Sequence, residues 1–215
     1  MNLRQLNQDR VQRVKAVAFA LCLIPLVHLG WLGLRGRLGA NPIEYITHST
    51  GWWTLAFLLL TLTITPARRL TNWNWLLKLR RMLGLYAFFY VCLHFTTYLW
   101  LDQFFDWKSI VKDIGKRPFI TVGFAAFLLL IPLASTSTHA MVRRLGARRW
   151  QRLHRAVYAI GVLGVLHFWW LVKKDIREPL IFGALLGALL LVRLVYAARK
   201  AAASTPPSGT RSQTA

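Results

Sequence analysis

Cysteine is scarce in this chain. Its 215 residues include two cysteines, Cys22 and Cys92, and both lie inside apolar runs. Two isolated thiols of this kind provide neither a disulfide framework nor a CxxC metal site. We therefore expect both to be free structural thiols.

Acidic residues are also few, since seven Asp and Glu stand against 28 Lys and Arg, and the formal net charge is +21. In a soluble protein this charge would suggest nucleic-acid binding. The sequence, however, is 55% hydrophobic, contains ten tryptophans and has a positive mean hydropathy. These values are typical of a polytopic membrane protein. Because the basic residues lie between apolar runs, membrane topology explains the charge better, and we expect no nucleic-acid partner.

The hydropathy pattern predicts six membrane spans and therefore an all-α integral membrane protein. The spans are about 16–34, 51–65, 82–101, 119–134, 152–172 and 179–198. The first run is long for the apolar region of a signal peptide and is not followed by a small-x-small cleavage site, so we interpret it as a retained helix. The predicted organisation is an N-terminal cytoplasmic segment (1–15), a six-helix membrane domain (16–198) and a disordered cytoplasmic tail (199–215).

The distribution of Lys and Arg predicts the orientation. If the N-terminus is cytoplasmic, the inner segments, with the arginines just inside the adjoining spans, carry 19 of the 28 basic residues and only one acid, Asp9. The outer segments carry nine basic residues and the other six acids. An excess of basic residues marks the cytoplasmic side. We therefore expect both termini to face the cytoplasm.

Two histidines fall at matching depths. His94 lies about twelve residues into the third predicted span and His167 about fifteen residues into the fifth, which runs in the same direction. Polar side chains inside a membrane are costly and generally functional. Two neutral imidazoles on facing helices can bind both axial positions of a haem iron. We predict that His94 and His167 ligate one haem in the outer half of the bilayer.

We also predict that His154, at the inner end of the same span as His167, is a ligand of haem iron. The thirteen residues between them rise about 20 Å along a helix, but they leave the two side chains nearly half a turn apart. Helix tilt, or a distortion near Gly161 and Gly164, would be needed to bring both histidines toward one bundle interior. At the same level on the third span the chain has Arg80 and Arg81. Arginine does not readily ligate iron, although it could bind a haem propionate or a flavin phosphate. The alternative is that these arginines only end the helix at the lipid headgroups.

The remaining histidines give weaker signals. We expect His28, in the first span, to be a hydrogen-bonded core residue. His48 and His139 fall in predicted loops, where an ordinary exposed position is expected.

Several motifs resemble those of the MsrQ family. They cover roughly residues 10–198 and read LGANPIE, TGWWTL, LTITPARR, RRMLGLYAFFYVCLH, LASTS and RLGARRWQRLHRAVYAIGVLGVLHFWW. More broadly, they resemble the ferric-reductase-like transmembrane domain that eukaryotic NADPH oxidases share. The resemblance places the family's histidines at His94, His154 and His167. In the NADPH oxidases a fourth histidine stands where this chain has Arg80 or Arg81.

The resemblance implies a b-type cytochrome of the bacterial inner membrane that binds one or two haems b and FMN. It would pass electrons to MsrP, a periplasmic molybdopterin enzyme that reduces methionine sulfoxide in envelope proteins, and would not reduce the sulfoxide itself. No nucleotide-binding domain follows the sixth span, so the quinone pool or a cytosolic flavin reductase is the expected donor. Asp102, Asp106 and Trp107 are candidates for the MsrP contact.

Two alternatives remain open at this stage. The first is another ferric-reductase-type or quinol-linked di-haem cytochrome with a different acceptor. The second is a haem-free membrane scaffold or transporter whose histidines only pack.

Overall fold

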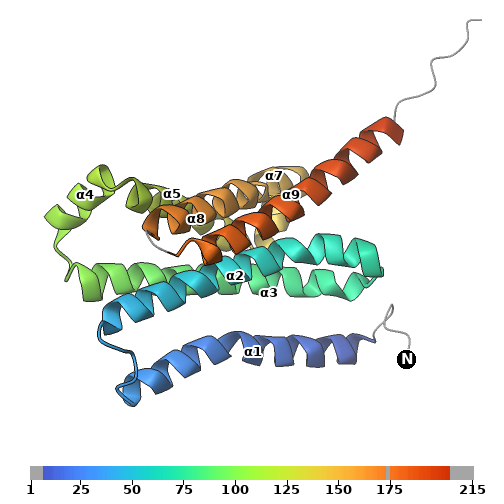
Figure 1. The fold of residues 1–215 in the computed structure, drawn as a ribbon. Helices are drawn as coiled ribbons and strands as arrows, with labels where there is room; N and C mark the ends of the chain where they lie inside the picture. The colour runs from blue at the N-terminus through green and yellow to red at the C-terminus, as the bar shows by residue number, and fades with distance from the viewer. Residues whose placement is uncertain (1–6, 173–174, 204–215) are drawn as a thin grey trace, which may run out of the picture.

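The computed structural model describes residues 7–172 and 175–203, and all regular structure in these ranges is helical (Figure 1). Long helices make up most of the fold: α1 (Gln8–Leu34), α2 (Pro42–Thr71), α3 (Leu77–Thr96), α5 (Pro118–Ser135), α8 (Ala156–Leu171) and α9 (Arg177–Ala203). The short elements are η1 (Asn74–Leu76), the π-helical η2 (Thr97–Asp102), α4 (Trp107–Lys116), α6 (His139–Leu145) and α7 (Ala147–His154). The all-α prediction is therefore confirmed.

Within the described residues, five helical segments are long and apolar enough to cross a membrane: Gln8–Leu34, Pro42–Thr71, Asn74–Asp102, Pro118–Ser135 and Arg177–Ala203. The predicted fifth span, 152–172, is divided at Arg155, where α7 ends and α8 begins. From the sequence, helix tilt or a distortion near Gly161 and Gly164 were the two ways to bring His154 and His167 to one interior, and the break at Arg155 was not among them. With 16 residues, α8 is shorter than the other candidates. The chain is thus a multi-pass membrane protein, and its sixth span stays a prediction.

Helix α2 is longer than the predicted span at both ends. It begins after Asn41, whose side chain accepts a hydrogen bond from the Glu44 backbone N–H, and Pro42 occupies the first turn. Both residue types favour helix starts at these positions. The helix ends at Asn72, which adopts a left-handed conformation with φ 60°. The Asn-Pro pair therefore starts a helix, so His48 lies on α2 and not in a loop.

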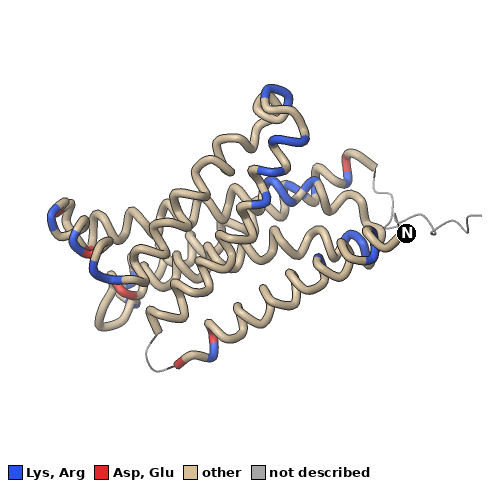
Figure 2. Tube along the Cα trace, turned by 90° about the horizontal axis from the view of Figure 1, so that it is seen from above, with Lys and Arg blue, Asp and Glu red and all other residues tan. Residues whose placement is uncertain are grey.

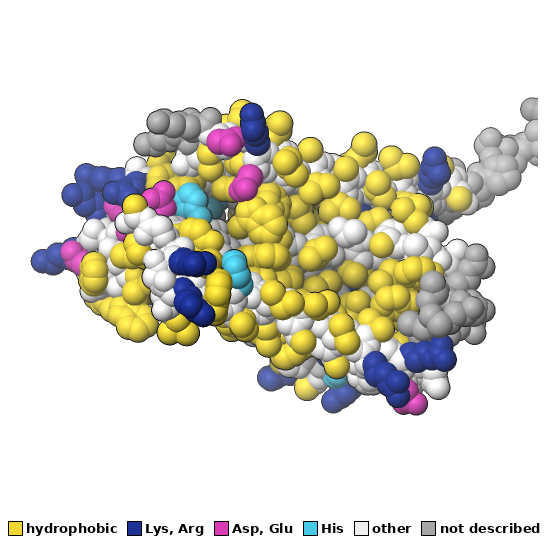
Figure 3. Space-filling model, turned by 60° about the horizontal axis from the view of Figure 1, so that its bottom comes forward, with side chains coloured by type: hydrophobic (Ala, Val, Ile, Leu, Met, Phe, Trp, Pro, Cys, Tyr) yellow, Lys and Arg dark blue, Asp and Glu magenta, His cyan; other side chains and the backbone are white. Residues whose placement is uncertain are grey.

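The two ends of the bundle differ in charge. One end, which we call the basic end, holds the start of α1, the turn between α2 and α3, α6 and α7, and the C-terminal part of α9 (Figures 1 and 2). The opposite end holds the turn between α1 and α2, helix α4, and the start of α9, and six of the seven acids lie there (Figure 2). Between the two ends, the face of the molecule shown in Figure 3 is largely hydrophobic.

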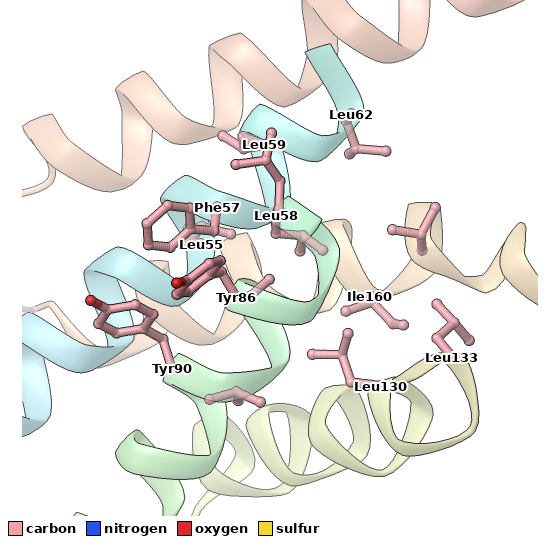
Figure 4. Packing of buried hydrophobic residues seen from close by; sticks show 14 of the residues in the cluster. Leu55, Phe57, Leu58, Leu59, Leu62, Tyr86, Tyr90, Leu130, Leu133 and Ile160 are labelled. Atoms are coloured by element: carbon pink, nitrogen blue, oxygen red, sulfur yellow. The ribbon is translucent and has the colours of Figure 1, made fainter. Parts of the chain in front are cut away.

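The core lies between α2, α3, α5 and α8. Phe57 stacks on Tyr90 with ring centroids 5.2 Å apart, and Leu130 and Ile160 pack on the other side of α3 (Figure 4). The Tyr90 hydroxyl donates to the Cys22 backbone oxygen at 2.9 Å. This bond attaches α1 to α3, because a tyrosine in an apolar core needs a partner for its O–H.

α9 compensates for a proline in α2. Pro66 has no N–H, so it leaves the Leu62 carbonyl without its helical donor. The Arg193 side chain of α9 donates from Nη2 to this carbonyl at 2.5 Å and from Nη1 to the Tyr158 hydroxyl of α8 at 2.7 Å. An unsatisfied carbonyl is expensive in a membrane. Arg193 therefore joins α2, α8 and α9.

A double-mutant cycle can test this compensation. Arg193→Met should destabilise the protein by about 1–3 kcal/mol, since it leaves the Leu62 carbonyl unpaired. In the Pro66→Ala background the carbonyl regains a helical donor, so the same substitution should cost less. Unfolding of the four proteins in mixed detergent micelles measures the difference. Equal costs in the two backgrounds would show that Arg193 does not serve the Leu62 carbonyl.

Candidate functional site

A cavity of about 510 Å³ lies toward the opposite end of the bundle, between α2, α3, α5 and α8. Its volume is in the range of small-molecule and cofactor sites, roughly 300–1,000 Å³. Most of its lining is apolar or aromatic, and both His94 and His167 border it. Polar side chains stand at its edge: Asn41, Glu44, His48, Asp102 and Arg117.

The rings of His94 (α3) and His167 (α8) face each other in this cavity. Their centroids are 6.1 Å apart and their planes lie at 83°. A metal–imidazole bond of about 2 Å, with about 1 Å more from the nitrogen to the ring centre, puts two rings that share one metal ion about 6 Å apart. The observed separation therefore suits two imidazoles on one metal ion.

The hydrogen bonds of the two rings determine which nitrogen is free. His94 Nδ1 lies 2.9 Å from the Thr47 backbone oxygen, and His167 Nδ1 lies 2.7 Å from the Phe119 backbone oxygen. A carbonyl oxygen can only accept, so each Nδ1 carries the proton and donates. Each Nε2 then keeps its lone pair. A backbone carbonyl on the far nitrogen is the usual support of a metal-ligating histidine.

Two glycines allow the rings to reach these carbonyls. A Cβ atom on Gly51 of α2 would lie 3.1 Å from the His94 ring, and one on Gly123 of α5 would lie 2.6 Å from His167 Nδ1. Each glycine comes four residues after the accepting carbonyl, on the same face of the helix. The same arrangement thus occurs twice, on α2 and on α5. Neither glycine was predicted from the sequence, although an isolated glycine inside an apolar helix was the available signal.

His154 has a different environment, outside the cavity of the other two. Its Nε2 lies 3.1 Å from Thr136 Oγ1, and its ring stacks on Trp150 with centroids 3.9 Å apart. The Thr136 hydroxyl donates to the Pro132 backbone oxygen at 2.5 Å, so it accepts from His154. In this arrangement Nε2 carries the proton, and Nδ1 is the nitrogen with a lone pair.

The side chains of Arg80 and Arg81 lie in different parts of the structure. Arg80 lies near the charges or polar groups of Tyr158, Arg193 and His154, at the basic end. Arg81 instead lines a second cavity between α1 and α3. Of the two arginines, only Arg80 therefore lies beside His154.

The other three histidines are all exposed. His28 is exposed on α1 and stacks on Trp31, so the prediction of a core position was wrong. His139 is exposed at the first position of α6, as expected. His48 is exposed too, but it borders the cavity.

Comparison with known proteins gives the family. Residues 50–165 match the family model described as ferric reductase like transmembrane component. Over 199 residues the chain is 57% identical to the protein-methionine-sulfoxide reductase heme-binding subunit MsrQ of Herminiimonas arsenicoxydans, covering 92% of this chain and 91% of that protein. The chain belongs to the MsrQ family. The MsrQ of Rhodospirillum rubrum is 56% identical over 94% of this chain and 96% of that protein, and the MsrQ of Ralstonia nicotianae is 55% identical over 89% of both. No solved structure matches.

Proposed function

We propose that this protein is the haem-binding membrane subunit of a methionine-sulfoxide reductase system and that His94 and His167 would bind the iron of a haem b. One observation carries the proposal: two imidazoles 6.1 Å apart in one cavity, each with Nδ1 on a backbone carbonyl. The curated relatives, which are named as heme-binding subunits, support the same reading.

The residues around the cavity fit a haem. An apolar lining suits the porphyrin ring, and the imidazole pair suits an iron that the porphyrin already holds on four sides. No group of three or more His, Cys, Asp or Glu arranged for a bare metal ion occurs in the described part of the chain. Arg117 and His48 at the edge are the side chains that could pair with propionates.

A bound haem supplies one-electron redox chemistry, and the chain's own residues determine where and under what conditions it occurs. Thr47 and Phe119 hold the two imidazoles in the tautomer that leaves Nε2 free. The apolar walls exclude water and lower the local dielectric. Gly51 and Gly123 fix how closely each ring approaches its helix.

The proposed path runs across the bacterial inner membrane, through six spans with both termini in the cytoplasm. The basic end would face the cytoplasm, where the quinone pool or a cytosolic flavin reductase donates electrons. His154 and Arg80 would belong to an inner cofactor site, for a second haem or for FMN, whereas Arg81 lines the separate cavity between α1 and α3. The opposite end would face MsrP in the periplasm. Asp102, Asp106 and Trp107 are exposed there and available for that contact.

Reoxidation of the reduced protein tests this function. The purified protein, reduced with stoichiometric dithionite, should stay largely reduced with a catalytic amount of MsrP alone and become fully oxidised when methionine sulfoxide is added as well. Stopped-flow absorption of the haem bands measures the rate. A ferric chelate serves as the competing acceptor. Rapid oxidation by the chelate, together with none by MsrP and sulfoxide, would favour a ferric reductase with a different acceptor.

A further inference from the structure

A second cavity, of about 650 Å³, lies between α1 and α3 and shares no lining residue with the histidine cavity. We call it the α1–α3 groove. Its lining comes from α1 (Gln12, Lys15, Ala16, Phe19, Leu23) and α3 (Lys78, Arg81, Met82, Leu85, Tyr86, Phe89). Helix α1 lies at the edge of the bundle (Figure 1), so the groove faces the surroundings of the protein.

The charged side chains of the groove all carry the same sign. Lys15, Lys78 and Arg81 line it together with no acidic residue. The two ion pairs within the described ranges, Arg117–Asp113 and Arg177–Asp175, involve none of these three cations. Three cations brought together by two helices attract an anionic group.

The rest of the groove is apolar and runs away from these cations. Phe19 and Leu23 follow Lys15 on one face of α1, while Leu85 and Phe89 follow Arg81 on one face of α3. Eight residues of helix rise about 12 Å, so both walls provide an apolar surface of about that length.

Two contacts join the walls of the groove. The Tyr86 hydroxyl donates to the Phe19 backbone oxygen at 2.9 Å, and the Phe19 and Tyr86 rings meet edge to face at 5.4 Å. The two walls are therefore joined by a bond between the helices, while Phe19, Leu85 and Phe89 remain exposed.

We propose that the α1–α3 groove binds an anionic phospholipid. Its phosphate lies among Lys15, Lys78 and Arg81, and one acyl chain lies along Phe19, Leu23, Leu85 and Phe89. An anionic headgroup suits the end of the groove that carries the three cations, and a long acyl chain suits the apolar end. A soluble phosphate leaves the apolar walls unused, and a neutral quinone leaves three cations without a counter-charge. A zwitterionic lipid brings a cation of its own beside its phosphate, so its net charge compensates none of the three.

Native mass spectrometry of the delipidated protein tests the proposal. Phosphatidylglycerol and phosphatidylcholine with the same acyl chains are added in competition, and the wild type should retain phosphatidylglycerol with a preference of about tenfold or more. The triple variant Lys15→Gln, Lys78→Gln, Arg81→Gln should lose this preference. The matched control, Arg10→Gln, Arg13→Gln, Arg143→Gln, removes the same charge outside the groove and should keep it.

A second pair of variants tests the apolar walls. Leu85→Trp places bulk in the groove and should reduce phosphatidylglycerol retention, whereas Leu129→Trp, at another exposed position of the bundle, should not. Equal losses in the two triple variants would overturn the proposal, since general surface charge would then explain binding. Displacement of the lipid by added glycerol phosphate, or by an added neutral quinone, would also overturn the proposal.

Discussion

Replacing His94 or His167 by alanine is expected to abolish the six-coordinate, low-spin haem spectrum of the purified protein. In the proposed site each histidine would supply one bond to the haem iron across a 6.1 Å ring separation, and His48, the other imidazole that borders this cavity, is an exposed residue of α2. The iron then becomes five-coordinate and high-spin, or the haem is lost. Absorption spectra of the oxidised and reduced protein, with haem quantified as its pyridine complex, measure both outcomes.

The control histidines separate ligation from general damage. His28→Ala and His139→Ala change exposed side chains and should leave the spectrum as in the wild type. His154→Ala should leave the low-spin signal of the outer site, and a lower haem content in that variant would reveal an inner haem. A His94→Ala or His167→Ala protein with the wild-type haem content and low-spin spectrum would contradict the pairing.

Gly123→Ala is expected to disrupt haem binding almost as strongly, although it leaves both histidines in place. The added Cβ would lie 2.6 Å from His167 Nδ1, so the ring must leave the Phe119 carbonyl. In a helix, alanine is favoured over glycine by about 1 kcal/mol. Loss of haem therefore cannot be assigned to a weaker helix. We expect a shift from low-spin to high-spin haem, measured by absorption and magnetic circular dichroism.

The three Gly→Ala substitutions should differ in the size of their effect on haem binding. A Cβ on Gly51 would lie 3.1 Å from the His94 ring, so Gly51→Ala should give a smaller effect than Gly123→Ala. Gly187 of α9 has nothing within 4 Å of its Cβ position, and Gly187→Ala should have no effect. If Gly123→Ala keeps the wild-type spectrum, the close contact between this glycine and His167 does not control ligation.

The sequence predicted the helical class. Counting residues along two apolar runs also predicted that His94 and His167 lie at the same depth in the membrane. Depth needs only the rise per residue and the direction of each span. The structure adds the partners of the rings. The carbonyls of Thr47 and Phe119 belong to neighbouring helices, and hydropathy carries no information on how those helices face one another.

Three other features of the structure could not be predicted from the sequence. The break at Arg155 has no proline or glycine to mark it, and it divides the predicted fifth span into α7 and α8. Helix α9 continues to Ala203, so residues 199–203 of the predicted tail are helical, and residues 204–215 lie outside the described residues. The bond from Arg193 to the Leu62 carbonyl depends on Pro66, 127 positions earlier in the chain.

Low-temperature EPR of the oxidised wild-type protein tests the central claim most directly. Two imidazoles on one ferric haem with ring planes at 83° should give a highly anisotropic low-spin signal, because perpendicular rings leave the iron d orbitals nearly degenerate. The signal should disappear in both His94→Ala and His167→Ala. A well-resolved rhombic signal of parallel imidazoles, or a high-spin signal in the wild type, would contradict the ligation of one haem by these two rings.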